Sequence, residues 1–553
     1  MSQRSRVRRR RRSPAVLLAG AVAVCLPAAL IATPTATATH STAAAVTTDA
    51  PGDLVDRDVT ELKGMLDEGA VTSKQLVDTY LQRIEAYEDP YAEEPGVNAV
   101  ITVNNRARGQ AARLDSERRR GELRGPLHGI PIVVKDNFDT ADLPTTSASV
   151  ALQDLRPDDD STQVRRLREA GAIIVAKTNM HEYAMSITTI SSLGGQTRNP
   201  YDQQRHPGGS SGGTGAAVAA SFAPVGMGTD TCGSIRIPAA HNNLVGLRPT
   251  MGLSSRAGIA PLAGTQDTAG PLGTSVRDVA LILDATAGYD PADPVTEAAQ
   301  GEVPPSYLDT LSTEALQDTR IGVFSDYFGD EGDEQLTTDI VTAAIEDMVD
   351  QGAEAVDLGA QPAIMEAAAG ANRVSHEFER DLNAYLADSA AGQLPELAAL
   401  EPPEDVVTLA DIATSGQVTP SVLGTLRAWV DSPELPNPEY EETLRQRDVL
   451  QDRLTELMAT HDLDALVYPS ITEPPTPVGT TQSYLNCRLS GYSGFPALSL
   501  PAGLTEDGLP VGVELLGRPF SEPTLLGMGH DYEQATEHRT PPQSTPALTP
   551  DGG

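Results

Sequence analysis

The apolar positions that follow Asp53 repeat with the period of a helix. Three or four residues separate each member of one apolar series from the next: Val55, Val59, Leu62 and Leu66. This spacing places the four side chains on one helical face. The segment SKQLVDTYLQRIEAY comes next, and we expect a second helix there that begins on a capping serine, Ser73. The fold is therefore predicted to begin with helices, ahead of any strand.

Short apolar runs rich in β-branched residues alternate with helical patterns in the rest of the chain. PIVVKD ends its apolar run on Lys135, TQVRRLREAG has the pattern of a helix closed by Gly171, and AIIVAK follows as a second strand. TRIGVFSD, EAVDLG, LDALVYPS and LPVGVELLG are further strand-like runs, each next to a helical stretch. This alternation predicts an α/β fold with a central mixed β-sheet flanked by helices on both faces.

One long section differs in composition from its surroundings. Residues 290–460 are richer in Ala, Glu, Asp and Pro and contain the longer helical patterns. Because strand-like runs resume at 465–500, we expect an inserted helical section within a single domain that spans residues 53–540, and not a separate second domain. The end of the chain, residues 541–553, has the Pro- and Gly-rich composition of a disordered tail.

Residues 1–38 have the three parts of an export signal. Seven arginines lie within residues 1–12, an uncharged apolar run follows at Ala15–Ala32, and the small residues of Ala36–Ala38 form an A-x-A site. We expect cleavage there and a secreted, extracellular protein that begins with a flexible stub at residues 39–52. A membrane anchor is the alternative, since the apolar run is nearly long enough to span a bilayer. The arginines leave both the general and the twin-arginine export routes open.

The charge balance excludes two classes of partner. The chain carries 77 acidic and 40 basic residues, for a net charge of −37. Removal of the signal with its seven arginines changes the net charge to −44. A surface this acidic repels phosphate backbones and anionic lipids. We therefore expect neither nucleic acid nor a membrane surface as a partner of the mature chain.

The cysteines and histidines do not form a metal-binding pattern. Cys25 lies in the signal, which leaves Cys232 and Cys487 for the mature chain. A disulfide between them is possible in principle, but we expect none because Cys232 lies in a glycine-rich stretch with the features of a reaction centre. The nine histidines are scattered without H-x-x-x-H or H-E-x-x-H spacing. The sequence thus predicts no metal and no cofactor.

Two glycine-rich stretches carry the residues most suited to chemistry. Residues 208–213 read GGSSGG and precede an apolar helical run, while residues 228–236 read GTDTCGSIR. A phosphate-binding loop would require G-x-x-x-x-G-K-[ST], and no lysine stands at the required place. The dinucleotide-binding fingerprint is absent as well, which argues against a nucleotide site.

These stretches, with GLRPTMGLSSRAGI after them, resemble the amidase signature family of serine hydrolases. The resemblance covers most of residues 55–540. PLHGIPIVVKDN and DGLPVGVELLG are similar to the peptide amidase branch of that family. The resemblance implies the amidase signature fold and hydrolysis of carboxylic amides to an acid and ammonia or an amine, without a cofactor.

The resemblance also implies a Ser–Ser–Lys catalytic triad. Ser234 corresponds to the nucleophile, Ser210 to the bridging serine and Lys135 to the base, and the Gly209–Ser210 peptide bond is expected to be cis. A serine hydroxyl needs a base to remove its proton. A buried lysine can be that base, because burial disfavours its charged form.

The family's oxyanion hole consists of main-chain amides, which correspond here to those of Thr231, Cys232 and Gly233 together with the nucleophile's own. The family usually has glycine where this chain has Cys232, and we expect the thiol to shape the acyl pocket. Gly209 and Tyr183 are candidate substrate contacts, with packing as the equal alternative for Tyr183. The charged residues next to the nucleophile, Asp230 and Arg236, are expected to form a structural ion pair.

The expected substrate is a small-molecule amide or an amidated peptide, and the sequence leaves the oligomeric state open. A second hypothesis is an amidotransferase A-type subunit that supplies ammonia to misacylated tRNA, because TNMHEYAM and TRNPYD resemble motifs of that protein. The export signal and the acidic charge argue against this hypothesis. A third hypothesis is an inactive ligand-binding homologue. All three triad positions are intact, which argues against this hypothesis.

Overall fold

The structure is a computed structural model that describes residues 54–89, 96–389, 393–394, 407–483 and 485–548. The predicted export signal at 1–38 and the stub at 39–52 lie outside the described residues. No helix in the described ranges is both long and apolar enough to cross a membrane.

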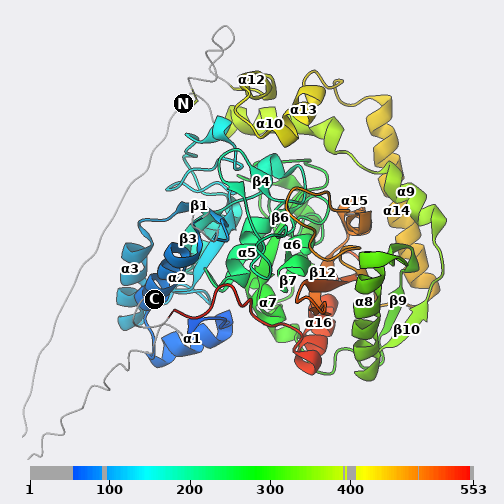
Figure 1. The fold of residues 1–553 in the computed structure, drawn as a ribbon, viewed down its shortest axis with the longest axis horizontal. Coiled ribbons are helices and arrows are strands. Elements are labelled where there is room, and N and C mark those ends of the chain that lie inside the picture. The colour runs from blue at the N-terminus through cyan, green and yellow to red at the C-terminus, as the bar shows by residue number, and fades with distance from the viewer. Residues whose placement is uncertain (1–53, 90–95, 390–392, 395–406, 484, 549–553) are drawn as a thin grey trace, which may run out of the picture. The chain divides into compact units, whose positions relative to one another are not determined.

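An 11-stranded mixed β-sheet forms the centre of the described part (Figure 1). Its strands are β1 (Val100–Val103), β2 (Pro131–Lys135), β3 (Ile173–Thr178), β6 (Val225–Asp230), β7 (Val245–Arg248), β8 (Thr268–Gly273), β9 (Arg320–Val323), β10 (Glu354–Asp357), β11 (Ala465–Pro469), β12 (Ala497–Leu504) and β13 (Pro510–Leu516). Their spatial order is β1-β3-β2-β6-β8-β7-β12-β13-β11-β9-β10. A separate small pair joins β4 (Ile190–Ser191) to β5 (Gly195–Gln196).

The strands run in both directions, which confirms the predicted mixed sheet. β2 pairs in parallel with β3 on one side and with β6 on the other, whereas β8 pairs antiparallel with both β6 and β7. The parallel pairing of β2 and β6 brings their carboxyl ends to the same edge of the sheet.

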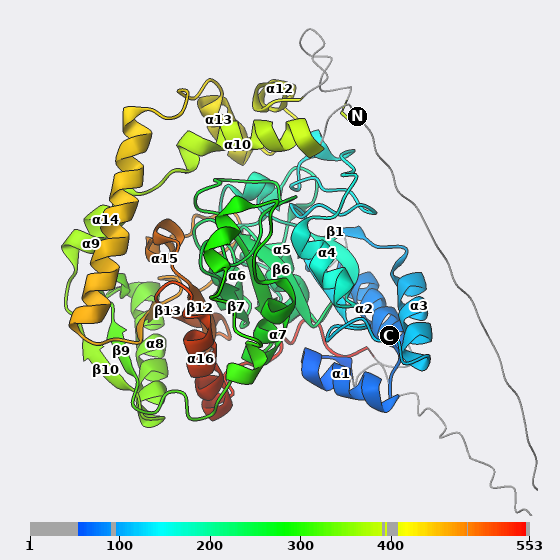
Figure 2. The ribbon, with the colours of Figure 1, turned by 180° about the vertical axis from the view of Figure 1, so that it is seen from behind.

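Helices cover both faces of the sheet, as the two opposite views in Figure 1 and Figure 2 show. The larger helices before the long insertion are α1 (Val59–Glu68), α2 (Ser73–Tyr87), α3 (Ala107–Arg119), α4 (Thr162–Glu169), α5 (Gly212–Ala219), α6 (Arg236–His241) and α7 (Val276–Thr286). Side chains of β2 alternate between the faces: Ile132 and Val134 join a cluster with α4 and α7, while Val133 joins one with α5 and α6. A strand that is buried on both faces reads as a continuous apolar run, which is why PIVVK could be recognised.

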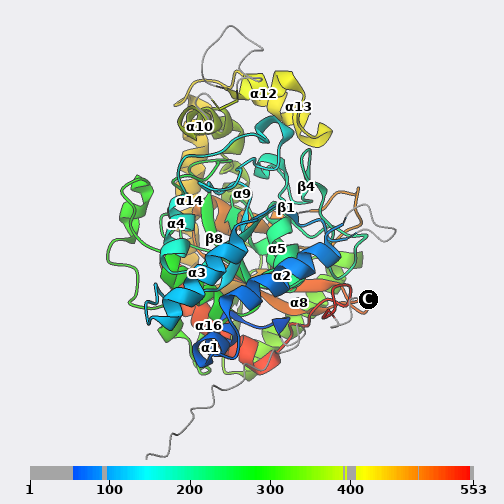
Figure 3. The same cartoon turned by 90° about the vertical axis from the view of Figure 1, so that its left-hand side faces the viewer.

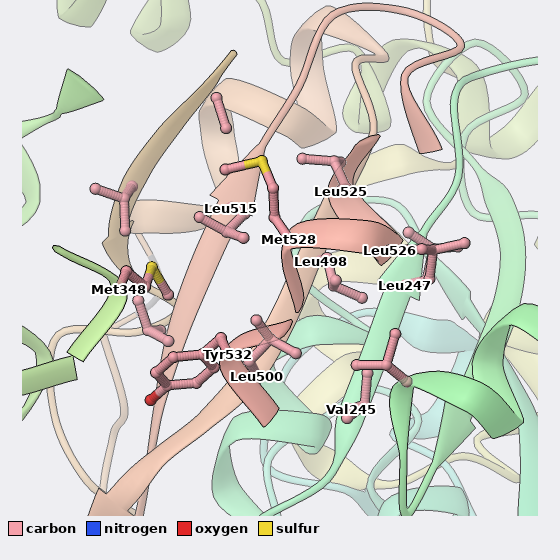
Figure 4. Close-up of a cluster of buried hydrophobic side chains, with 14 of the residues drawn as sticks. Val245, Leu247, Met348, Leu498, Leu500, Leu515, Leu525, Leu526, Met528 and Tyr532 are labelled. Carbon is pink, nitrogen blue, oxygen red and sulfur yellow. The ribbon is translucent and has the colours of Figure 1, made fainter. Parts of the chain in front are cut away.

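A large apolar cluster packs the C-terminal half of the sheet against α7, α8 (Gly332–Asp350) and α16 (Glu522–Thr536). Figure 4 shows its centre, where Leu498, Leu500 and Leu515 of the sheet meet Leu525 and other side chains of α16. All four leucines are fully buried. This cluster therefore packs one face of the strands between β7 and β13 against the same layer of helices.

The section 290–460 is not purely helical. Two short 3-10 helices come first, and the strands β9 and β10, with α8 between them in the chain, then extend the sheet at one edge. The section continues with the helices α9 (Pro362–Gly370), α10 (Val374–Ser389), α12 (Leu409–Ser415), α13 (Pro420–Trp429) and α14 (Pro438–Thr460). The helices α10, α12 and α13 lie together in Figure 1 and Figure 3 and share an apolar cluster. The short helix α15 (Arg488–Ser493) follows between β11 and β12.

Two local predictions were wrong. Thr72, and not Ser73, caps α2: its hydroxyl accepts from the amide of Gln75, whose side chain in turn accepts from the Thr72 amide. Residues 541–548 of the predicted disordered tail pack onto the domain, because the buried guanidinium of Arg83 donates to the carbonyls of Thr545 and Pro546. Residues 549–553 lie outside the described part.

Candidate active site

The site lies where the carboxyl ends of β2 and β6 meet. Lys135 is the last residue of β2, and β6 ends at Asp230, just before the loop that contains Ser234. Val134 pairs with Met227 in the parallel register. The sheet therefore brings together a lysine and a serine that lie far apart in the sequence.

Lys135 is fully buried and points at two hydroxyl groups. Its Nζ donates to Ser210 Oγ at 2.7 Å and to Thr229 Oγ1 at 2.8 Å. Burial lowers the pKa of Lys135 to about 7, against the opposing effect of the negative charges on Asp267 and Asp230. At neutral pH a large fraction of this amine is thus uncharged and able to accept a proton.

Ser210 belongs to the glycine-rich turn that leads into α5. The Gly209–Ser210 bond is cis, as predicted. Thr189 holds this turn from outside, because its hydroxyl donates to the carbonyl of Gly208 at 2.7 Å and accepts from the amide of Gly212 at 3.2 Å. Nothing in the sequence marks Thr189 for this role, since it comes from a separate loop that precedes the turn.

Ser234 lies in the loop after β6 and is 4% exposed. Its carbonyl accepts from the amide of Ser211 at 3.2 Å, which ties this loop to the glycine-rich turn. Ser234 lines a cavity of about 280 Å³, and its hydroxyl makes no hydrogen bond to any other residue that the structure describes. The structure thus places Ser210 and Ser234 on neighbouring, hydrogen-bonded segments.

The main-chain amides around Ser234 divide into two groups. The amide of Gly233 donates to Asp230 Oδ1 at 2.8 Å. Those of Thr231, Cys232 and Ser234 have no acceptor among the described residues. The inclusion of Gly233 in the predicted oxyanion hole was therefore wrong, because its N–H already donates to the carboxylate of Asp230.

A buried ionic network lies beneath this loop and confirms the predicted ion pair. Arg236 Nε lies 3.1 Å from Asp230 Oδ2, and Arg248 Nη1 lies 2.9 Å from Asp230 Oδ1. Arg236 also pairs with Glu514 of β13 at 2.5 Å. The two guanidinium groups hold the pKa of the Asp230 carboxyl well below its usual range, despite its burial.

Cys232 and Cys487 form a disulfide, contrary to the sequence-based expectation. Cys487 immediately precedes α15, which packs directly on the loop of Ser234. A sequence separation of 255 residues gives no local sign of this contact. The expectation was wrong because it considered only the neighbours of Cys232 along the chain.

The cavity beside Ser234 is lined by apolar and uncharged polar residues. Its wall includes Ile187, Leu262, Trp429 and Tyr492, with Asn372 among the polar members, and none of the described residues in this wall is charged. A second cavity, of about 250 Å³, shares Ala184, Thr231 and Leu262 with the first. The wall of this second cavity contains three charged residues: Arg256, Asp267 and Asp293.

Neither predicted substrate contact lines these cavities. The ring of Tyr183 is 2% exposed and packs edge-on against Phe378, with ring centroids 6.3 Å apart. Gly209 faces the backbone of Ile187, which a Cβ atom on Gly209 would approach to 2.7 Å. Both residues are therefore packing residues that lie outside the lining of the two cavities.

Sequence reasoning missed Thr229 and Asn137. The hydroxyl of Thr229 accepts from Lys135 and from Asn137 Nδ2, the latter at 3.2 Å. A signal was present, since Asn137 closely follows Lys135 and Thr229 lies shortly before Ser234 in the same motif. In the described ranges, no three His, Cys, Asp or Glu side chains converge in a way that could hold a metal ion.

Comparisons with known proteins identify the family of the chain. The protein-family profile described as "Amidase" matches residues 75–526. The A-type subunit of the glutamyl-tRNA(Gln) amidotransferase of Halorhodospira halophila is 36% identical over 500 residues, which cover 88% of this chain and 98% of that protein.

Two solved structures are similar over most of the chain. The native peptide amidase of Stenotrophomonas maltophilia matches with a TM-score of 0.77 at 37% identity, covering 88% of this chain and 98% of that one. The A-type subunit of the glutamyl-tRNA(Gln) amidotransferase of Thermotoga maritima matches with a TM-score of 0.65 at 25% identity, covering 87% and 95%.

Proposed function

Because the chain belongs to the amidase family over residues 75–526, we propose that it hydrolyses carboxylic amides to an acid and ammonia or an amine. Ser234 is the nucleophile, Ser210 relays the proton and Lys135 is the base. The observation that carries this proposal is the 2.7 Å hydrogen bond between Lys135 Nζ and Ser210 Oγ in a fully buried setting. An amine with a pKa of about 7 that contacts a serine hydroxyl is poised for general base catalysis.

In the first half of the reaction, Ser234 Oγ attacks the carbonyl carbon of the amide. Its proton passes to Ser210, whose own proton passes to neutral Lys135. The attack requires Ser234 Oγ to turn toward Ser210 Oγ, and the hydrogen bond between Ser211 N and Ser234 O keeps the two segments close enough. The charge that develops on the carbonyl oxygen is stabilised by the amides of Thr231, Cys232 and Ser234, which have no acceptor among the described residues.

The leaving amine then takes a proton from Lys135 through Ser210, and an acyl-enzyme on Ser234 is left. Water enters the cavity and is activated by the same two residues. Its attack releases the acid and restores the hydroxyl of Ser234. The same residues are suited to ester hydrolysis, since the departure of an alcohol depends less on protonation than the departure of an amine.

The substrate is an uncharged or amidated molecule with an apolar side. The cavity beside Ser234 combines the rings of Trp429 and Tyr492 with Leu262, and none of the described residues in its wall is charged. A group with a free charge would lose its hydration there without compensation. C-terminally amidated peptides and aryl amides both fit this chemistry.

A second candidate function is that of an amidotransferase component, which the sequence relatives favour. Proteins named as the A-type subunit of glutamyl-tRNA(Gln) amidotransferase are 36% and 32% identical to this chain in two species, over nearly their whole length. Such a protein would supply ammonia to misacylated tRNA together with partner proteins. Against it stand the acidic charge, which repels tRNA, and the higher structural similarity to the peptide amidase.

We also propose that the protein is exported. Residues 1–38 have the composition of an export signal. The Cys232–Cys487 disulfide supports this proposal, because disulfides persist in oxidising compartments and are rare in the cytosol.

Assays of the purified protein on primary amides, aryl amides and C-terminally amidated peptides test the main proposal. We expect turnover of at least one class, and loss of that activity in Ser234→Ala. Ser312→Ala is the matched control, because Ser312 is exposed and lines neither cavity. Equal rates in Ser234→Ala and the parent protein would contradict the mechanism, and filter binding of tRNA by the parent protein would favour the amidotransferase function.

A further inference from the structure

Cys232 contributes an amide to the proposed oxyanion hole, and its side chain is covalently joined to Cys487, 255 residues later. We propose that this disulfide fixes the direction of the Cys232 amide and so makes Cys232 and Cys487 positioning residues for amide hydrolysis. The inference rests on the proposed function, since it assigns a role within that same site.

The loop and α15 are in direct contact. A Cβ atom on Gly491 of α15 would lie 2.9 Å from the carbonyl oxygen of Thr231 and 3.0 Å from Cys232 Cα. A Cβ atom on Gly233 would lie 2.9 Å from Cys487 Cβ. Only residues without a side chain allow the two segments to approach this closely. A shift of α15 would therefore move the loop directly.

Asp230 and Arg236 restrain one part of the loop. Asp230 accepts from the amides of Gly233 and Ile235, and Arg236 links that carboxylate to the carbonyl of Cys487 at 3.3 Å. These bonds hold the part of the loop that faces the buried ionic network. They do not involve the amides of Thr231, Cys232 and Ser234.

The residues on the cavity side have other restraints, and the carbonyl of Ser234 accepts from the amide of Ser211 at 3.2 Å. Thr231 is held by its hydroxyl, which donates to Asp267. Among the described residues, no hydrogen bond involves the amide or the side chain of Cys232, so the disulfide is its one directional restraint. Cys232 also lines the cavity and is partly exposed, so a small reductant can approach the disulfide from there.

An oxyanion donor works only within about 2.7–3.1 Å of the developing negative charge. Because that charge exists in the transition state and not in the bound substrate, a misdirected Cys232 amide lowers kcat more than it raises KM. Removal of one such donor typically costs about 10²–10³-fold in kcat. Loss of the tether alone leaves the donor present but mobile, and we expect a fall in kcat of about 10–100-fold.

Cys487→Ala is the central variant, because it breaks the disulfide without altering the loop itself. We expect kcat to fall by about 10–100-fold while KM stays within about threefold. Active-site titration fixes the concentration of competent enzyme, so that partial unfolding is not counted as slow turnover. Cys232→Ala should behave in the same way, and the double variant should be no worse than either single variant, because all three lose the same tether.

A ketone probe gives a readout that a purely structural disulfide would not change. Ser234 Oγ adds to the carbonyl carbon of a trifluoromethyl ketone analogue of the substrate, its proton passes through Ser210 to Lys135, and the C=O π bond breaks to leave an oxyanion in the hole. We expect its affinity to fall in Cys487→Ala by about the same factor as kcat, while the affinity of an unreactive amide analogue stays within about threefold. Equal losses for the two ligands, or an unchanged kcat, would overturn the proposal.

Dithiothreitol provides the same test on the folded parent protein, should the variants fail to fold. The reductant breaks the Cys232–Cys487 bond to give two thiols and is itself oxidised to a cyclic disulfide. We expect kcat to fall and to recover on reoxidation, whereas oxidised dithiothreitol is the control and should leave kcat unchanged. A fully reduced protein with undiminished kcat would refute the role of the disulfide. Failure of the proposed function differs from this outcome, since the untreated parent protein would then show no Ser234-dependent hydrolysis at all.

Discussion

At the scale of single residues, the site depends on charges that burial has altered. Lys135 is the last residue of β2 and Lys177 is the last but one of β3. Both lysines are fully buried, yet their surroundings differ. Lys177 lies 3.3 Å from the carboxylate of Asp136, whereas the hydrogen bonds of Lys135 go to hydroxyl and carbonyl oxygens. Burial lowers the pKa of Lys177 as well, but the neighbouring Asp136 carboxylate opposes this shift, whereas Lys135 has no ion-pair partner among the described residues. This contrast supports Lys135, and not Lys177, as the proposed base.

The pKa of about 7 for Lys135 predicts the pH dependence of hydrolysis. Since only the neutral amine accepts a proton, kcat/KM should rise with pH, with a midpoint near pH 7, and fall about tenfold per unit well below it. The measurement is kcat/KM across the range from acidic to alkaline pH. Burial also raises the pKa of Asp139 to about 6, so Asp139→Asn is the control and should leave the midpoint in place. A midpoint below about pH 5 would exclude Lys135 as the titrating base.

The carboxylate of Asp230 should contribute strongly to stability. Asp230→Asn leaves the buried guanidinium groups of Arg236 and Arg248 without their shared counter-charge, and we expect a loss of about 3–5 kcal/mol in the free energy of unfolding. Urea denaturation measures the loss. The control is Glu122→Gln, which removes an exposed partner of Arg120 and should leave the midpoint of unfolding nearly unchanged. Similar midpoints for the two variants would show that the network is not stabilising.

At the scale of elements, the parallel pair β2 and β6 builds the site and the helices of the insertion enclose it. Trp429 at the end of α13 lines the cavity beside Ser234. Asp139, shortly after Lys135 in the chain, accepts from Tyr385 Oη of α10 at 2.7 Å and from Ser389 Oγ at 3.2 Å. This buried carboxylate attaches the helical section to the segment that carries Lys135.

Removal of one of these donors should loosen the helical section. Tyr385→Phe deprives the buried Asp139 of a hydrogen bond, and we expect a loss of about 1–3 kcal/mol in the free energy of unfolding. Denaturant titration measures this loss, with Tyr289→Phe as the control because Tyr289 is 47% exposed. Equal stability of Tyr385→Phe and the parent would mean that the contact does not hold α10.

At the scale of the whole molecule, the sequence anticipated the sheet because strands such as β2, β3 and β13 are buried along their whole length and read as apolar runs. It also placed Lys135, Ser210 and the loop of Ser234 in motifs that the sheet then brings together. The disulfide, the role of Thr229 and the anchoring of the C-terminal segment by Arg83 were missed. The disulfide and the contacts of Arg83 join residues far apart in sequence, and local patterns carry no information about such pairs, whereas Thr229 lies in the same motif as Ser234 and that signal was overlooked.

Export is a prediction at this same scale. Residues 1–38 fused to a periplasmic or extracellular reporter enzyme should carry it out of the cell, since they combine a basic start, an apolar run and a cleavage site. Fractionation of the culture measures the reporter's location, and a fusion that starts at residue 39 is the control. Retention of both fusions inside the cell would contradict export.

The most direct test of the mechanism is to locate the acyl group on the enzyme. The protein is mixed with an excess of an activated acyl substrate, quenched in acid within milliseconds, digested and analysed by mass spectrometry. We expect the added acyl mass on Ser234 in the parent protein and no such adduct in Ser234→Ala. An acyl group found on another residue, or turnover with no covalent intermediate, would contradict the assignment of Ser234 as the nucleophile.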